Sequence, residues 1–219
     1  MFHIHRIVNI PVPSNCFVLY DKSANSDCII VDPGTKNNEE LIAYITKQEL
    51  TPVYIILTHE HFDHCWGVNE LLSLYHVPIV CSKFCAEAIK DSKKNCSVFY
   101  DNLEAFEIDS ETISVEDLNF KLFWGSYEVK FYLTPGHTDA SISFTIGGGL
   151  FTGDALIKDM RTVTKLPTGS MVKLKELLEQ LKRMQGYGFE IYPGHGDVFE
   201  LDGYDLDKMT MGQIDHNCL

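Results

Sequence analysis

The feature that most constrains this chain is a histidine-rich segment that directly follows a run of apolar residues. The run Val53-Tyr54-Ile55-Ile56-Leu57 is rich in β-branched residues and does not alternate, which predicts a strand buried on both faces. Thr58 ends that run, and His59-Glu60-His61-Phe62-Asp63-His64 follows at the carboxyl end of the predicted strand. Because α/β folds place their chemistry at that end of their strands, we expect the chain to build a site here.

Three imidazoles and one carboxylate within this short segment indicate metal ligation, since neutral histidine is the commonest protein ligand for zinc and similar ions. In extended geometry, His59 and His61 point to the same side and can bind one ion. A turn into helix would then direct Asp63 and His64 toward a second ion. Glu60 alternates away from both histidines, so we expect it to face solvent or to support the ligands from behind. The competing interpretation, a surface loop with accidental histidines, explains the pattern less well.

Two ions need about three or four ligands each, so other segments must contribute. Three segments share one design, in which a predicted strand is followed by glycine and then by histidine or aspartate: Gly136-His137, Gly153-Asp154 and Gly194-His195. Glycine permits a positive φ angle or a close approach of backbone to a cluster. Each segment alone would more often be a turn with a structural polar residue. Their recurrence favours His137, Asp154 and His195 as further ligands.

The remaining pattern predicts an α/β fold with two β layers. Strands are expected at 2–10, 16–20, 27–31, 53–57, 79–81, 120–124, 129–133, 142–146, 150–151 and 190–192, the first three as a β-meander. Helices are expected after Asn37 or Asn38, at 68–75, at 84–89 and at 170–184. This order predicts two β layers with helices outside, and the lack of a Pro/Ser/Gly linker predicts a single domain, residues 1–219.

The charge of the chain restricts its partners. Acidic residues outnumber basic ones by 31 to 18, which gives a formal net charge of −13. Nucleic acid and acidic membrane surfaces are therefore not expected as partners. Bound divalent cations would offset the charge locally, so a small-molecule substrate can still be anionic. The oligomeric state stays open.

The cysteines and the amino terminus bear on the compartment. Seven cysteines form an odd set without a Cys-x-x-Cys pair, which argues against a disulfide framework and against a thiolate zinc site. The amino terminus has polar residues where a signal peptide needs an unbroken apolar run, and no later segment has the length of a membrane span. We therefore expect a soluble, cytoplasmic protein.

Together, the segment from Thr58 to His64 with His137, Asp154 and His195 resembles the metallo-β-lactamase superfamily, especially its glyoxalase II-like (hydroxyacylglutathione hydrolase-like) branch, over nearly the whole chain. The resemblance implies an αββα sandwich, with two mixed β-sheets and helices on their outer faces. By position, it implies one ion held by His59, His61 and His137, a second held by Asp63, His64 and His195, and Asp154 as the bridge between them. The implied cofactors are two divalent metal ions, zinc first, with iron or manganese as alternatives.

This site implies a hydrolase. A water molecule between two divalent cations loses its proton near neutral pH and becomes a nucleophile, and the chain offers no Gly-x-Ser-x-Gly elbow. Asp63 would act as the catalytic residue by holding the hydroxide in line while it ligates metal. Arg161 and Lys165 lie in a stretch that resembles small glyoxalase II-like proteins and are candidates for binding a substrate carboxylate, although a structural loop charge explains them equally well.

A thioester or related ester is the first expectation for the substrate. Persulfide dioxygenases share the His-x-His-x-Asp-His pattern but bind one iron, so a mononuclear iron oxidoreductase is the main alternative. A lactonase on the same scaffold is another. A binding module without catalysis is disfavoured because no ligand position is missing.

The first prediction concerns glutathione. Glyoxalase II continues beyond its metal domain into a helical domain that contacts glutathione through cationic groups, whereas this sequence ends soon after His195. Missing charge-assisted contacts, each worth ~1.5–3 kcal/mol, would weaken transition-state binding by orders of magnitude. We expect zinc-loaded protein to hydrolyse lactoylglutathione and a thioester without the glutathione peptide with similar kcat/KM. An advantage of about a hundredfold for lactoylglutathione would contradict this expectation.

Overall fold

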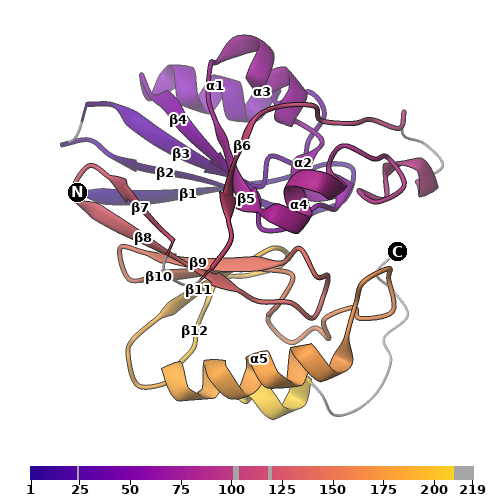
Figure 1. The fold of residues 1–219 in the computed structure, drawn as a ribbon. Coiled ribbons are helices and arrows are strands. Elements are labelled where there is room, and N and C mark those ends of the chain that lie inside the picture. Colours follow the sequence, from indigo (N-terminus) through magenta and orange to yellow (C-terminus); the bar gives the residue numbers. More distant parts are fainter. Residues whose placement is uncertain (24, 101–103, 118–119, 210–219) are drawn as a thin grey trace.

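Two facing β-sheets with helices on their outer sides make up the computed structural model, which describes residues 1–23, 25–100, 104–117 and 120–209 (Figure 1). The first six-stranded sheet has the order β1-β2-β3-β4-β5-β6, and the second has the order β12-β11-β10-β9-β8-β7. Both sheets contain parallel and antiparallel pairs. The predicted αββα sandwich of two mixed sheets is therefore confirmed.

The first half of the chain forms one sheet and its helices. Its elements are β1 (Phe2–Val8), β2 (Asn15–Asp21), β3 (Asp27–Val31), α1 (Glu39–Lys47), β4 (Thr51–Ile56), α2 (Phe62–Cys65), α3 (Val68–Leu74), β5 (Ile79–Ser82), α4 (Lys83–Ala88), the 3-10 turn η1 (Ser97–Phe99) and β6 (Thr112–Val115). The first three strands pair antiparallel in sequence order, so the predicted β-meander is confirmed.

The second half forms the other sheet and one long helix. Its elements are β7 (Lys121–Trp124), β8 (Tyr127–Leu133), β9 (Ile142–Ile146), β10 (Gly149–Gly153), α5 (Met171–Met184), β11 (Glu190–Pro193), β12 (Phe199–Glu200) and the 3-10 turn η2 (Leu206–Met209). Ser170 is the N-cap of α5 and accepts a hydrogen bond from the Lys173 amide, as its position before the apolar stripe predicts.

Three hydrophobic cores hold the layers together. The first lies between the first sheet and helices α1, α3 and α4, the second lies between the two sheets, and the third lies under α5. Along β2, for example, Val18 belongs to the first core, whereas Phe17 and Leu19 belong to the second. Because both faces of the central strands are buried, their sequences are apolar without alternation.

The sequence did not predict β6 or β12, and it predicted the start of α1 for the wrong reason. β6 has only four residues and β12 only two, too few for a clear period. Asn38 does precede α1, but its side chain makes no capping bond and its Nδ2 donates instead to the Gly67 carbonyl at 2.8 Å. This bond fastens the start of α1 to the turn before α3.

Three further expectations concerned the cysteines, membrane-spanning segments and the number of domains. The six described cysteines are free thiols, and five of them are buried; Cys218 lies outside the described residues. None of the described helices has the length and apolar composition needed to cross a bilayer. The assignment of residues 1–219 to a single domain stays a prediction.

Candidate metal centre

All predicted ligands lie at one edge of the sandwich, where strands of both sheets end. His59 follows β4, His137 follows β8, Asp154 follows β10 and His195 follows β11. The two sheets are joined at this edge by a hydrogen bond from the Ile142 amide to the Thr58 carbonyl (2.8 Å). The topology thus brings together residues that are far apart in the sequence.

The local geometry of the histidine-rich segment follows the sequence prediction. His61 has an extended backbone and is the N-cap of α2, so the chain turns into a helix immediately after it. This turn places Asp63 and His64 within α2, whereas His59 and His61 precede it. All four side chains are largely buried, with His59 at 1% and His64 at 0% exposure.

Two glycines let the backbone approach the cluster. Gly153 has φ +49°, and a Cβ atom there would lie 2.4 Å from Thr58 Oγ1. A Cβ atom at Gly194 would lie 2.1 Å from Asp154 Oδ1. Any side chain at these positions would push the strand ends apart, which explains why glycine precedes Asp154 and His195.

The first group of candidate ligands is His59, His61 and His137, whose nitrogen atoms lie within 4.8 Å of one another. His137 Nε2 lies 2.9 Å from His61 Nδ1. The His59 ring centroid lies 4.8 Å from that of His61 and 4.9 Å from that of His137. These three rings surround one point, as a metal with three imidazole ligands requires.

Asp63, His64 and His195 form a second group, also within 4.8 Å. His195 Nε2 lies 3.3 Å from Asp63 Oδ2 and 3.4 Å from His64 Nε2. Asp154 lies between the groups: its Oδ2 is 3.7 Å from His137 Nε2, and its Oδ1 is 3.5 Å from His64 Nε2. The carboxylate of Asp154 therefore contacts both groups.

The unsatisfied atoms of the cluster fit a bound cation. His59 Nε2 and Asp154 Oδ1 are buried and have no hydrogen-bond partner. Leaving such an atom unpaired costs about 1–3 kcal/mol, more when the group is charged. A divalent cation would satisfy both atoms, and nitrogen and carboxylate donors are the set that zinc and related ions prefer.

Electrostatics favour positive charge at this place. Burial alone would lower the pKa of His64, but Asp63, Asp154 and Asp32 outweigh burial and raise the pKa to about 10. In contrast, burial and the neighbouring histidines lower the pKa of His59 well below its ordinary value, which keeps its imidazole in the neutral, ligating form. The structure brings all seven predicted ligands together; that they bind metal stays a prediction.

Asp32 supports the cluster from behind, and sequence reasoning missed it. Its Oδ2 accepts a hydrogen bond from Thr58 Oγ1 (2.6 Å) and lies 3.0 Å from His64 Nδ1. Such a carboxylate orients the imidazole ring and raises its basicity. The available signal was its position after β3, since β3 runs parallel to β4 and ends at the same edge.

Backbone carbonyls orient two more rings. His137 Nδ1 donates to the Val163 carbonyl at 2.8 Å, and His195 Nδ1 donates to the Pro13 carbonyl at 3.1 Å. Both bonds leave Nε2 of the ring facing the cluster. Each ring is thus fixed by a segment distant from its own strand.

Asn15 clamps the loop that carries His195. Its Nδ2 donates to the carbonyls of Pro193 and Gly196, each at 2.9 Å, and its backbone amide donates to the Gly194 carbonyl at 2.6 Å. Asn15 is 2% exposed. The start of β2 in the first sheet therefore holds a ligand loop of the second sheet.

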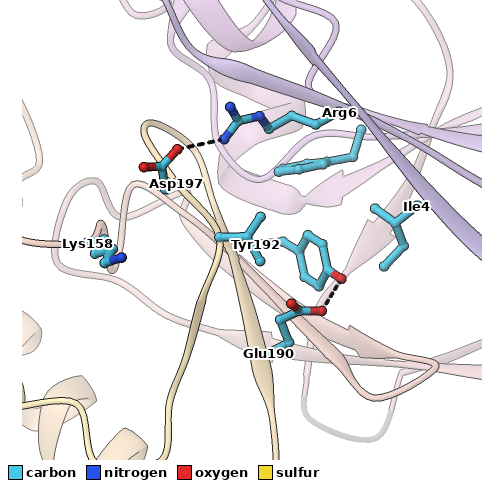
Figure 2. A pocket seen from close by; sticks show the side chains of 8 residues that line it. Ile4, Arg6, Lys158, Glu190, Tyr192 and Asp197 are labelled. Carbon is cyan, nitrogen blue, oxygen red and sulfur yellow. Dashed lines mark hydrogen bonds and ion pairs between the residues drawn. The ribbon is translucent and has the colours of Figure 1, made fainter.

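Arg6 adds to this clamp at the wall of a groove outside the metal cluster. Its Nη1 donates to the Gly196 carbonyl at 2.8 Å and pairs with Asp197 at 3.4 Å (Figure 2). The groove, of about 530 Å³, is also lined by Tyr192, whose hydroxyl donates to Glu190. None of the predicted ligands lines this groove.

Glu60 is 5% exposed, so of its two expected positions solvent exposure is wrong. Its Oε2 accepts a hydrogen bond from Thr138 Oγ1 at 2.9 Å. Thr138 directly follows His137, so this bond links the segments that carry the first group of ligands. Cys65 is fully buried in the first core, as expected for a small apolar side chain.

The proposed substrate-binding residues lie in the segment between β10 and α5. Arg161 and Lys165 are both exposed. The same segment contacts the cluster through the Val163 carbonyl, and Thr168 Oγ1 accepts a hydrogen bond from the Asp139 amide at 3.1 Å. Arg161 and Lys165 are each two residues away from Val163, whose carbonyl contacts His137. Their role in substrate binding stays a prediction.

The sequence of this chain is similar to those of known proteins. The model of the metallo-beta-lactamase superfamily matches residues 9–195. A "probable metallo-hydrolase" of Streptococcus pyogenes is 28% identical over 207 residues, covering 90% of this chain and 84% of the relative. "Glyoxylase B2" of Dictyostelium discoideum is 31% identical over 170 residues, covering 73% of this chain and 56% of the relative.

Solved structures show the same fold. The BLEG-1 B3 metallo-beta-lactamase superposes with a TM-score of 0.82 at 24% identity, covering 91% of this chain and 94% of that chain. TTHA1623 in a di-iron-bound form superposes with a TM-score of 0.77 at 21% identity, covering 90% and 94%.

The second prediction concerns the residue between the two groups. Asp154→Asn should lower metal occupancy and reduce hydrolysis by roughly a hundredfold or more, because a neutral amide cannot bridge two cations as a carboxylate does. Elemental analysis and turnover measure the two effects. Asp159→Asn, an exposed position on the following loop, is the matched control. Two metals per chain and full turnover in Asp154→Asn would contradict the assignment.

The third prediction concerns the clamp. Asn15→Ala leaves the Pro193 and Gly196 carbonyls without this donor and should weaken binding of the second metal by about tenfold, as loss of outer contacts does at metal sites. Chelator competition measures the affinity, and His195→Ala, expected to hold about one metal per chain, gives the limiting case.

Asn69→Ala is the control for this change, because Asn69 also donates to a backbone carbonyl, that of Glu107, at an exposed place. If Asn15→Ala and Asn69→Ala hold the second metal equally well, Asn15 does not position His195.

Proposed function

We propose that this chain, which belongs to the metallo-beta-lactamase superfamily, is a binuclear metal-dependent hydrolase that cleaves a thioester or related ester. One observation carries the proposal: the seven side chains form three overlapping groups of donors, and Asp154 contacts the other two groups. A mononuclear site would need only His59, His61, His137 and one further ligand. Asp63 and His195 would then have no metal to bind, although they form a second group of donors with His64.

The names of two relatives support the proposed hydrolase. The Streptococcus relative is named a probable metallo-hydrolase, and the Dictyostelium relative is named a glyoxylase. We therefore propose membership of the glyoxalase II-like branch, with a small molecule as substrate. The net charge of −13 is consistent with this choice, because it disfavours polyanionic substrates such as nucleic acid.

The ligands would divide as the sequence predicts, with His59, His61 and His137 for one ion, Asp63, His64 and His195 for the other, and Asp154 for both. When bound, two divalent cations would activate water for attack and polarise the substrate carbonyl. Asp63 would orient the attacking water through its carboxylate, which faces His195 and His64. Arg161 and Lys165 would bind an anionic group of the substrate away from the scissile bond.

The rigidity of the centre supports its catalytic use. His64 is fixed by Asp32, His137 by the Val163 carbonyl and His195 by the Pro13 carbonyl. Because each ring is fixed before substrate arrives, little reorganisation accompanies the reaction. Zinc is the proposed metal. Iron is the main alternative, since a di-iron form is known for a protein of this fold.

The fourth prediction tests the function itself. Protein purified without added metal should contain, or take up, two divalent ions per chain and hydrolyse small thioesters, and a chelator should abolish the activity until zinc is restored. Elemental analysis and a free-thiol assay measure these properties. One iron per chain, with oxygen consumption on a persulfide and no thioester hydrolysis, would establish the oxidoreductase alternative instead.

A further inference from the structure

We propose that Phe62, Trp66 and Tyr100 form a subsite for an apolar acyl or aryl group of the substrate beside the metal centre. This inference rests on the proposed function and adds the substrate class: esters or thioesters whose acyl part is aromatic or otherwise bulky and apolar. The three residues are called the aromatic wall below.

The aromatic wall borders the metal centre through the chain itself. Phe62 lies between His61 and Asp63 and is the first residue of α2. Consecutive Cα atoms are about 3.8 Å apart, so the backbone of Phe62 lies next to two predicted ligands. The Phe62 amide also donates to the Asn95 carbonyl at 2.8 Å, which brings the segment that contains Tyr100 to the same place.

Contacts between the rings make the wall continuous. The Phe62 ring centroid lies 5.1 Å from that of Tyr100 and 6.5 Å from that of Trp66. Phe62 and Trp66 are four residues apart and so lie on one side of α2. Trp66 stacks on Phe106 at 6.3 Å with an interplanar angle of 14°, and Phe106 packs against the first core. The wall is therefore anchored on its inner side.

The protein core does not use the outer side of the wall, where the ring of Trp66 has Lys36 Nζ 6.0 Å from its centroid. Phe62, Trp66 and Tyr100 are each half-buried, and none of them belongs to the three hydrophobic cores. Apolar surface beside a polar centre gains free energy when an apolar group covers it. Ligand sites commonly combine such surface with a few converging polar groups. The candidate metal centre supplies those polar groups. The proposed occupant of the aromatic wall is therefore the apolar part of the substrate.

The loop between β10 and α5, in the second half of the chain, could contact an anionic end of such a substrate. Arg161 and Lys165 belong to the loop between β10 and α5, which reaches the cluster through the Val163 carbonyl. In Figure 1, this loop and the segment after α4 project at the same end of the sandwich. The loop that carries the cationic residues and the segment that carries Tyr100 are thus both linked to segments that carry residues of the cluster, which fits an ester with an apolar end and an anionic end.

A comparison of acyl groups tests the subsite. With one leaving thiol, kcat/KM should be at least tenfold higher for a phenylacetyl than for an acetyl thioester, since half-burying a ring is worth roughly that factor. Phe62→Ala should reduce this ratio by about tenfold, mainly through KM, and Phe62→Leu should retain most of it. Tyr100→Ala should also lower this ratio, and this substitution leaves the sequence of the histidine-rich segment unchanged.

The matched control is Phe123→Ala, which removes a phenylalanine that is 66% exposed on β7, the outer strand of the second sheet. The ratio should not change in this variant. Metal content should match the parent protein in every variant, which separates loss of the subsite from loss of the centre. A parent ratio near one, or a ratio unaffected by Phe62→Ala and Tyr100→Ala, would overturn the proposal.

Binding without turnover separates this inference from the proposed function. The chain has two tryptophans, and Trp124 is only 5% exposed in the core between the sheets, so a ligand at the wall should change the fluorescence of Trp66 alone. Phenylacetate should change the fluorescence of zinc-loaded protein, whereas acetate, with the same carboxylate, should not. Phe62→Ala should raise the Kd for phenylacetate about tenfold, and Trp66→Phe should remove the signal.

The outcomes are distinct. Phenylacetate binding that depends on Phe62, without hydrolysis of any ester, would retain the subsite and refute the hydrolase. Ester hydrolysis with no response to phenylacetate would retain the hydrolase and refute the subsite. A change of oligomeric state in Phe62→Ala with an unchanged substrate ratio would show that the wall is an interface between copies of the chain, which also refutes the subsite.

Discussion

The close approach of five imidazoles and two carboxylates is the constraint on which the rest of this structure depends. His61 and His137 face each other at 2.9 Å between nitrogen atoms, and His64 and His195 at 3.4 Å. Protonated rings at such distances would repel, and neutral rings leave buried atoms such as His59 Nε2 without partners. A bound cation resolves both difficulties. The stability of the cluster would then depend on the same ions as its proposed chemistry, as is common where metal binding is coupled to folding.

The architecture meets this constraint by ending strands of both sheets at one edge. Core packing between the sheets, with ring contacts such as that of Phe17 in β2 with Phe151 in β10 at 5.4 Å, keeps the two layers in a fixed relation. Hydrogen bonds at the edge then set the ligand loops, as Asn15 does for the loop of His195. Because the ligands come from several strand ends, no single strand can shift without moving the cluster. Rigidity at the centre is thus a consequence of the fold.

The sequence predicted the two β layers and all seven candidate ligands, because buried strands and ligand segments each have a recognisable local pattern. Buried strands leave apolar runs, and the ligands leave a dense His-x-His-x-Asp-His segment and recurring glycines before Asp154 and His195. The supporting residues left weaker signals. Asp32 directly follows β3, Asn15 begins the apolar strand β2, and Glu60 alternates away from the ligands. Their roles depend on partners far away in the sequence, such as Thr138 for Glu60, which no local pattern specifies.

The residues proposed for the chemistry of this centre and those proposed for substrate contact also differ in where they lie in the fold. Four of the candidate ligands follow strand ends and the other three lie at or within α2, where the packing of the sheets and the hydrogen bonds between their loops fix each position. Tyr100 and Lys165 belong to connecting segments, which tolerate substitution better than strand ends do. Phe62 is the exception, since it shares α2 with Asp63 and His64 yet directs its ring to Trp66 and Tyr100. Under the proposed function, a change of side chain at Phe62 would therefore alter substrate contact from within the helix that carries Asp63 and His64, so substrate choice would depend on the same helix as the candidate ligands.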